Sequence, residues 1–150
     1  MDIVIVVAAI IAGYLIVRQM SRFGREGPSE GQAKYARLSN ATDLDTLFAS
    51  SSDQPRIVLL HDPWCPVSAR ASRQLAQVDA DIVMIDVSRQ HELSRQMEQR
   101  TGIRHESPQA MLIDNGEAVW HESHMGIDRK SIDRALEMWH AKREREQSRL

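Results

Sequence analysis

The sequence predicts an α/β domain, a central mixed sheet flanked by helices, preceded by one N-terminal transmembrane helix. Three observations support this prediction: short apolar runs alternate with segments of helical periodicity, an Asn-Gly pair joins the last two runs, and an uncharged apolar stretch stands near the start. The 150 residues are 42% hydrophobic and 27% charged, with a net charge of −2. This composition excludes a wholly disordered or polytopic membrane chain, and no basic excess indicates nucleic-acid binding.

The apolar stretch near the start predicts a membrane anchor. Residues 3–17, IVIVVAAIIAGYLIV, contain no charge and lie between Asp2 and Arg18. A spanning helix needs about 20 residues, and a snorkelling Arg18 extends the effective length, so we predict a transmembrane anchor over 1–20. A cleaved signal peptide and a buried core helix are the alternatives. Asp2 and the lack of a small-x-small cleavage site argue against the signal peptide.

Charges after the span predict its orientation. Arg18, Arg22 and Arg25 follow the apolar stretch, so the positive-inside rule places the rest of the chain in the cytoplasm. Residues 21–35 are rich in Gly, Ser and charge, contain Pro28, and predict a flexible tether. We therefore expect a single-pass protein of the inner (cytoplasmic) membrane. An exported domain is the alternative.

The first half of the domain alternates strand and helix. Leu44 and Leu47 fall on one helical face, and Pro55 breaks the chain after them. RIVLLH and DIVMIDV are compact apolar runs typical of buried strands, and a proline after Cys65 suits the first position of a helix. The expected elements are an extended segment at 35–38, a helix from Asn40 or Thr42, a strand at 56–61, a helix from Pro66 and a strand at 81–87.

The second half predicts a helix and a hairpin. Residues 90–101 have Leu93 and Met97 at helical spacing and end near Gly102. QAMLID follows Pro108, and Asn-Gly then leads into EAVWHE, which is the strongest short-range signal for a β-hairpin.

A last helix closes the domain. It begins at about Asp128 and is followed by a charged tail, 141–150, which we expect to fray into solvent and to leave 36–140 as the folded domain. The resulting order β-α-β-α-β-α-β-β-α predicts a mainly parallel sheet with an antiparallel hairpin at its edge. The apolar stripe of this helix consists of Ile132, Ala135, Leu136 and Trp139, and Trp120 is also expected in the core.

Cys65, the only cysteine of the chain, stands between a predicted strand and a predicted helix. Unpaired N–H groups and the helix dipole at such a position stabilise a thiolate, which attacks disulfides. A buried structural cysteine is the alternative. Ser68 could donate a hydrogen bond to the thiolate or cap backbone N–H groups, but it cannot form a disulfide. A single cysteine also excludes an intramolecular disulfide and zinc sites built on several thiolates.

Two segments resemble a known family. WCPVS at 64–68 resembles the active-site motif of thioredoxin-fold proteins in a C-P-x-S form, and TGIRHESPQAMLIDNGEAVWHESH at 101–124 resembles the second half of the monothiol bacilliredoxins. These are bacterial thioredoxin-like proteins associated with bacillithiol, and the resemblance covers roughly 36–137. Two features depart from the family: Trp64 stands where a small polar residue is expected, and the N-terminal anchor is additional.

The resemblance implies a thioredoxin-like fold and a monothiol thiol-disulfide oxidoreductase. Such an enzyme removes bacillithiol, or a similar low-molecular-weight thiol, from protein mixed disulfides. Cys65 would attack the bacillithiol sulfur and carry the bacillithiol until a second thiol or an external reductase restores it. The implied partners are S-thiolated proteins, the small thiol as co-substrate, that reductase, and the membrane through residues 3–20. No bound cofactor and no nucleic acid are expected.

The resemblance also implies that Ser107-Pro108 is the cis-proline beside the reactive cysteine. Its implied role is to turn the Ser107 backbone so that a substrate segment pairs with it as a short strand. An ordinary proline at the start of a strand is the alternative. We expect Trp64 to shield the thiol or to contact ligand. The supporting site residues are therefore Trp64, Pro66, Ser68, Ser107 and Pro108.

Other candidate chemistry is weaker. Several histidines and glutamates have a spacing that fits no common zinc pattern, so we predict no metal site; they are His105, Glu106, His121, Glu122 and His124. Arg70 falls one position short of the cysteine-phosphatase loop, and a helix start replaces the loop that would cradle phosphate. A non-catalytic, membrane-tethered binding module, with Cys65 incidental, is the alternative function.

Overall fold

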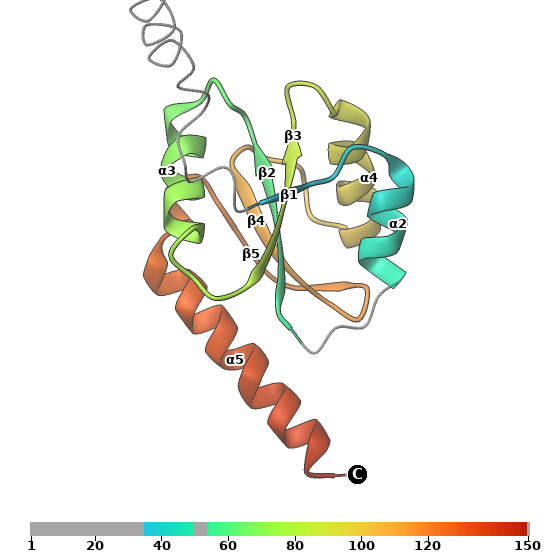
Figure 1. Ribbon diagram of the computed structural model, residues 1–150, viewed down its shortest axis with the longest axis vertical. Helices are drawn as coiled ribbons and strands as arrows, with labels where there is room; N and C mark the ends of the chain where they lie inside the picture. The colour runs from blue at the N-terminus through green and yellow to red at the C-terminus, as the bar shows by residue number, and fades with distance from the viewer. Residues whose placement is uncertain (1–34, 50–53, 150) are drawn as a thin grey trace, which may run out of the picture. The chain divides into compact units, whose positions relative to one another are not determined.

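Strands and helices follow one another in the order that the sequence predicts (Figure 1). The computed structural model describes residues 35–49 and 54–149, so the predicted anchor at 1–20 lies outside the described residues. Within the two described ranges, no helix has the length and apolar character needed to cross a membrane. The elements are β1 (Ala36–Arg37), α2 (Ala41–Ala49), β2 (Arg56–His61), α3 (Pro66–Leu75), β3 (Asp81–Asp86), α4 (His91–Thr101), β4 (Gln109–Asp114), β5 (Glu117–Ser123), the 3₁₀ turn η2 (His124–Gly126) and α5 (Arg129–Gln147).

The five strands form one mixed sheet in the order β1-β3-β2-β4-β5. β3 pairs in parallel with both β1 and β2, whereas β4 is antiparallel to both β2 and β5. The expectation of a mainly parallel sheet was therefore wrong, since half of the strand pairs are antiparallel. The cause is the segment 102–108, which returns the chain to the end of the sheet where β2 finishes, so that Leu60 pairs with Gln109.

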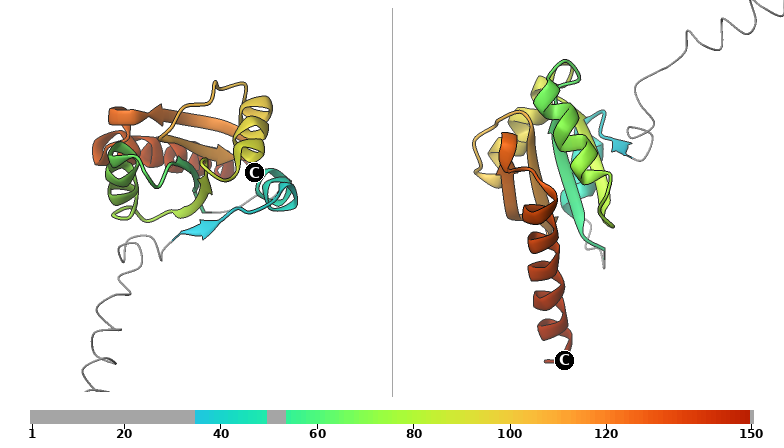
Figure 2. Two further views of the ribbon diagram at one scale, coloured as in Figure 1. Left: turned by 90° about the horizontal axis from the view of Figure 1, so that it is seen from above. Right: turned by 90° about the vertical axis from the view of Figure 1, so that its left-hand side faces the viewer.

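Helices cover both faces of the sheet. α3 and α5 lie on one face, and α2 and α4 lie on the other (Figures 1 and 2). β2 is therefore buried on both sides: Ile57 and Leu59 pack toward α3 and α5, while Val58 and Leu60 pack toward α2 and α4. Burial on both faces explains why this strand has a continuous apolar sequence instead of an alternating one.

Local signals explain where the helices begin and end. Pro66 occupies the first turn of α3. Asp128 caps α5, because its carboxylate accepts the Ser131 N–H at 2.8 Å. In return, the Ser131 hydroxyl oxygen accepts the Asp128 N–H at 3.3 Å, which completes a capping box. Gly102 ends α4 in the left-handed conformation with φ +69°.

The charged segment after residue 140 was expected to fray into solvent. Instead, α5 continues through it to Gln147. Lys142 extends from this helix to the buried Asp114 of β4, with 3.0 Å between Nζ and Oδ2, and lies 3.9 Å from Glu146 one turn further along. An ion pair with the sheet and a second pair along the helix stabilise turns that the hydrophobic stripe does not reach. Trp139 is buried and Trp120 packs partly buried against the same core, as expected.

The hairpin between β4 and β5 turns at Asn115 and Gly116, which have φ values of +49° and +80°. Positive φ at both positions is the signature of the turn that matches the twist of paired strands. A Cβ on Gly116 would lie 2.9 Å from the carbonyl oxygen of Phe48, whereas nothing lies within 4 Å of one on Gly102. The two glycines therefore share a left-handed backbone but differ in the space around them.

This difference predicts unequal costs for alanine at the two positions. Gly102→Ala should cost about 1 kcal/mol, because it forces a side chain into the left-handed region. Gly116→Ala adds the close contact with Phe48, on the order of 1–3 kcal/mol more. Urea unfolding of both variants beside wild type measures the two costs. Equal destabilisation by the two variants would show that the backbone at Phe48 moves aside at no cost, which would contradict the prediction.

Candidate functional site

The junction between β2 and α3 positions the thiol. Cys65 is the N-cap of α3, with extended φ and ψ of −95° and 119°, and Pro66 follows in the first turn. The Cys65 N–H donates to the Asp62 carbonyl at 3.1 Å, and the Cys65 carbonyl accepts from the Ala69 N–H at 3.1 Å. The predicted helix start at the cysteine is confirmed. The junction between the end of β2 and the start of α3 lies at the upper end of the sheet in Figure 1.

The environment of Cys65 favours its thiolate. The thiol is free and partly exposed. The backbone N–H of Ser68 is the largest influence and lowers the pKa of Cys65, helped by the Val67 N–H and the Ser68 hydroxyl, while partial burial and the Asp62 charge oppose this. The net effect is a lowered pKa. Partial exposure and a lowered pKa are the properties expected of a reactive cysteine, whereas a structural cysteine is typically fully buried.

Ser68 caps a backbone N–H group, which is one of the two roles predicted for it. Its side chain is fully buried, and its hydroxyl oxygen accepts the Asp62 N–H at 3.2 Å. The same hydroxyl can donate its proton to the Cys65 sulfur, because a hydroxyl donates once and accepts twice. Asp62 shapes the turn as well, since its carboxylate accepts the Trp64 N–H at 2.9 Å.

The Ser107–Pro108 peptide bond is cis, as the resemblance implied. Leu60 at the end of β2 pairs with Gln109, the residue after the proline, so the topology places Pro108 at the same end of the sheet as Cys65. Pro108 is buried, and its carbonyl accepts the His124 N–H at 2.9 Å. The antiparallel direction of β4 is what brings the start of this strand to the thiol.

Gln109 fixes the segment before the cis-proline, and sequence analysis did not identify it. Its buried side chain donates to the Arg104 carbonyl at 3.0 Å and to the Ser123 hydroxyl at 3.3 Å, and it accepts the Glu106 N–H at 3.4 Å. The signal in the sequence was a glutamine at the head of an otherwise apolar strand. A buried amide is retained only where its hydrogen bonds are met.

His61 is the second residue that sequence analysis missed. It ends β2 on the side that faces α3, is 2% exposed, and neither ring nitrogen has a hydrogen-bond partner among the described residues. Burial lowers the pKa of His61, while the charges of Asp86 and Asp62 oppose this shift. The folded protein therefore favours the neutral imidazole.

Trp64 does not cover the thiol as one alternative expected. Its side chain is 85% exposed, which leaves contact with a bound ligand as its predicted role. Beside the cis-proline, His124 Nε2 lies 3.5 Å from the Glu106 carboxylate, and His124 has a left-handed φ of +50°. This pair forms the exposed rim of the site.

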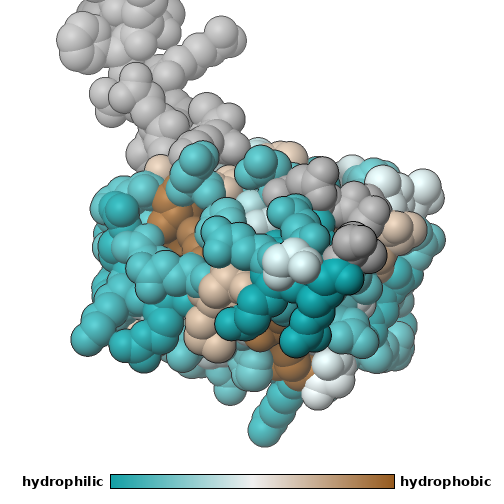
Figure 3. All heavy atoms as spheres, turned by 90° about the horizontal axis from the view of Figure 1, so that it is seen from below, coloured by the Kyte–Doolittle hydropathy of each residue, from teal (hydrophilic) through white to brown (hydrophobic). Residues whose placement is uncertain are grey.

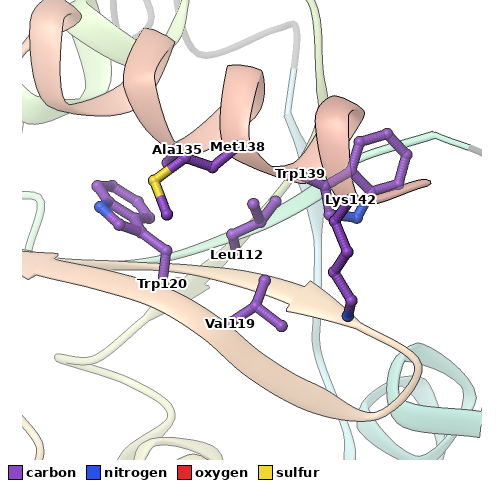
Figure 4. A pocket seen from close by; sticks show the side chains of 7 residues that line it. All are labelled: Leu112, Val119, Trp120, Ala135, Met138, Trp139 and Lys142. Carbon is purple, nitrogen blue, oxygen red and sulfur yellow. The ribbon is translucent and has the colours of Figure 1, made fainter. Parts of the chain in front are cut away.

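A separate apolar groove lies between α5 and the hairpin (Figure 4). Val119, Trp120 and Met138 point into it, with Leu112 as its floor. Along the β4–β5 ladder this floor is three residue pairs from Gln109, so the groove lies away from the thiol. The end of the domain opposite the thiol is mostly hydrophilic, with small hydrophobic patches (Figure 3).

A partly exposed thiol at a helix start, with a cis-proline at the same end of a mixed sheet, defines a thioredoxin-like oxidoreductase. The family model described as "Monothiol bacilliredoxin BrxC" matches residues 36–132, and this chain belongs to that family.

Solved structures agree on the fold. A thioredoxin-fold protein assigned as an oxidoreductase is 29% identical over 72% of this chain and 98% of its own, with a TM-score of 0.63. Mitochondrial thioredoxin 3 from Saccharomyces cerevisiae is 13% identical over 72% of this chain and 98% of its own, with a TM-score of 0.58. Thioredoxin from Fasciola hepatica is 15% identical over 69% and 97%, with a TM-score of 0.56.

Removing the Ser68 hydroxyl is expected to raise the pKa of Cys65. Ser68→Ala loses the side-chain hydrogen bond but keeps the backbone N–H, so the pKa should rise only part of the way to that of an ordinary thiol. The pH dependence of Cys65 alkylation by iodoacetamide measures this shift. Ser94→Ala, which removes a buried serine hydroxyl from α4, is the matched control. An unchanged profile in Ser68→Ala would contradict the contact.

Replacing His61 is expected to reduce the loss of free energy of unfolding at acid pH. A histidine with a lowered folded-state pKa destabilises the fold as the pH falls below about 6.5, because the unfolded chain then binds the proton first. His61→Phe removes this loss, so its free energy of unfolding should fall less between pH 7 and pH 5. Urea unfolding at each pH tests this. The exposed His91→Phe is the control, and identical slopes in both variants would contradict the assignment.

Proposed function

We propose that this protein is a monothiol thiol-disulfide oxidoreductase that removes bacillithiol, or a similar low-molecular-weight thiol, from protein mixed disulfides through Cys65. The observation that carries the proposal is the thiol at the N-cap of α3, with its pKa lowered by the Ser68 N–H and with a serine, not a second cysteine, three residues further on. Such a thiol can attack a disulfide but cannot resolve the product within the chain.

The proposed reaction is a pair of thiol-disulfide exchanges. The Cys65 thiolate attacks the bacillithiol sulfur; the bond between bacillithiol and the protein breaks, and the protein leaves as a thiolate that takes a proton from water. Cys65 then carries bacillithiol as a mixed disulfide. A second bacillithiol thiolate attacks this disulfide, which releases bacillithiol disulfide and restores Cys65. A dithiol reductase could supply the second step instead. Each exchange forms one disulfide bond and breaks one, so the disulfide passes from the substrate protein to the added thiol, and no bound cofactor is needed.

The residues around Cys65 have distinct roles in this proposal. Pro66 starts the helix at the thiol, and Ser68 stabilises the thiolate. The cis bond before Pro108 presents the Ser107 backbone, with which a substrate segment pairs as a short strand. Trp64, being exposed beside the thiol, contacts the bound substrate or thiol.

The proposal places the enzyme at the inner membrane. Residues 3–20 form the anchor, and the domain faces the cytoplasm, because Arg18, Arg22 and Arg25 follow the apolar stretch. A C-terminal fusion to alkaline phosphatase, which is active only after export, tests this orientation. We expect an inactive fusion in intact cells, with green fluorescent protein at the same position fluorescent. An active phosphatase fusion would contradict it.

Cys65→Ser tests the chemistry. The full chain in detergent is incubated with a protein that carries bacillithiol on its single cysteine, and the intact masses of both proteins are read. Wild type should gain one bacillithiol while the substrate loses one, and Cys65→Ser should gain none, a rate loss of at least about a thousandfold.

Ser148→Ala, a serine change at the C-terminal end of α5, serves as the control for the same measurement. If wild type accepts neither bacillithiol nor, in parallel reactions, glutathione or coenzyme A, the enzymatic proposal fails. A non-catalytic module that keeps its binding partners after Cys65→Ser would then account for the fold.

A further inference from the structure

The 3₁₀ turn η2 lies between the helix that carries Cys65 and the cis-proline. At one side, the His124 N–H donates to the Pro108 carbonyl at 2.9 Å, so the start of the turn is bonded to the cis-proline itself. At the other side, η2 packs against α3. A shift of this turn relative to α3 therefore acts on the Pro108 carbonyl, and through it on the position of Pro108 relative to Cys65.

Arg70 of α3 bonds to this turn and to Ile127, the residue that directly follows it. Its Nη1 donates to the Ile127 carbonyl at 3.0 Å and to the Met125 carbonyl at 3.5 Å, and these contacts join residues 55 and 57 positions apart in the chain. Both acceptors are backbone carbonyls, so the bonds fix the path of the main chain and not merely a side chain. A guanidinium presents several donors in a rigid plane and can serve two carbonyls at once, which an ammonium group does less well.

The other hydrogen bonds of η2 attach it to a different element. The Gly126 carbonyl accepts the Ser131 hydroxyl at 2.7 Å and the Asp128 N–H at 2.9 Å, which link the turn to the start of α5. Gln74 of α3 accepts the Arg129 N–H at 3.0 Å, but this bond also reaches α5 and not the turn. Arg70 is thus the α3 side chain whose described hydrogen bonds reach the turn that holds Pro108.

We infer that Arg70 is a positioning residue that sets the distance between the cis-proline and Cys65, and through it the affinity for the polypeptide part of the substrate. The inference rests on the proposed function. Arg70 acts through η2 and Pro108 and has no described contact with the Cys65 thiol, so the exchange chemistry itself does not need it. A substrate that pairs with the Ser107 backbone depends on Arg70, whereas a small disulfide without a peptide backbone does not.

Two substrates separate these contributions. One is a ten-residue peptide whose central cysteine carries bacillithiol, and the other is bacillithiol disulfide, which has no polypeptide segment. A small dithiol reductant completes both cycles, because exchange between bacillithiol and its own disulfide gives no net reaction. Arg70→Ala should raise KM for the peptide about tenfold at similar kcat, change turnover of bacillithiol disulfide less than about twofold, and leave the measured pKa of Cys65 unchanged. Arg73→Ala, which removes an exposed positive charge from the same helix, should behave as wild type on both substrates.

Arg70→Lys keeps the charge and loses the planar guanidinium, so it should raise KM for the peptide by less than Arg70→Ala and leave turnover of bacillithiol disulfide unchanged. If Arg70→Ala does not fold, Arg70→Lys replaces it as the test variant. Parallel losses on both substrates, a changed pKa of Cys65, or no loss on the peptide would overturn the inference. If wild type takes bacillithiol from neither substrate, the proposed function fails and this inference with it. If wild type is active and Arg70→Ala is equally active on both substrates, the inference alone fails.

Discussion

The Ser68 N–H reaches the Cys65 sulfur because Pro66 begins α3 directly after the cysteine. Without that helix start, the N–H groups of the first turn would have no common direction, and the thiol would be an ordinary one. The junction in turn depends on β2, whose burial on both faces of the sheet fixes the point where the chain leaves for the helix. One strand-to-helix junction therefore determines the position of the thiol and its tendency to ionise.

The mixed topology supplies the second half of the site. In a wholly parallel sheet, β4 would end beside Cys65 and its start would lie at the far end. Because β4 is antiparallel to β2, its start lies beside the thiol, and Pro108 comes with it. Gln109 and His124 then fix the two sides of the proline by hydrogen bonds. The segment that departs from simple alternation of strands and helices is thus the one that completes the site.

What could be predicted from the sequence was local. Cys65, Pro66 and Ser68 lie within four positions, so a helix start and its thiol follow from neighbouring residues, and the Asn-Gly turn follows likewise. The cis bond before Pro108 came only from the family resemblance, since most such bonds are trans. Arg70 and Gln109 bond to residues that only the fold brings near them. Neighbouring residues in the sequence therefore could not predict which carbonyls Arg70 bonds. They also could not predict that Trp64 is exposed. The anchor remains a prediction from charge and hydropathy.

The proposed exchange chemistry depends most directly on the ionisation of the single thiol. Thiolate absorbance at 240 nm, followed with pH in the full chain and referenced to Cys65→Ser, measures the pKa of Cys65 without any substrate. The proposed chemistry predicts a pKa below the value of an ordinary cysteine thiol. A pKa at or above that value would mean that the start of α3 does not stabilise the thiolate, and it would contradict the proposed role of Cys65 in disulfide exchange.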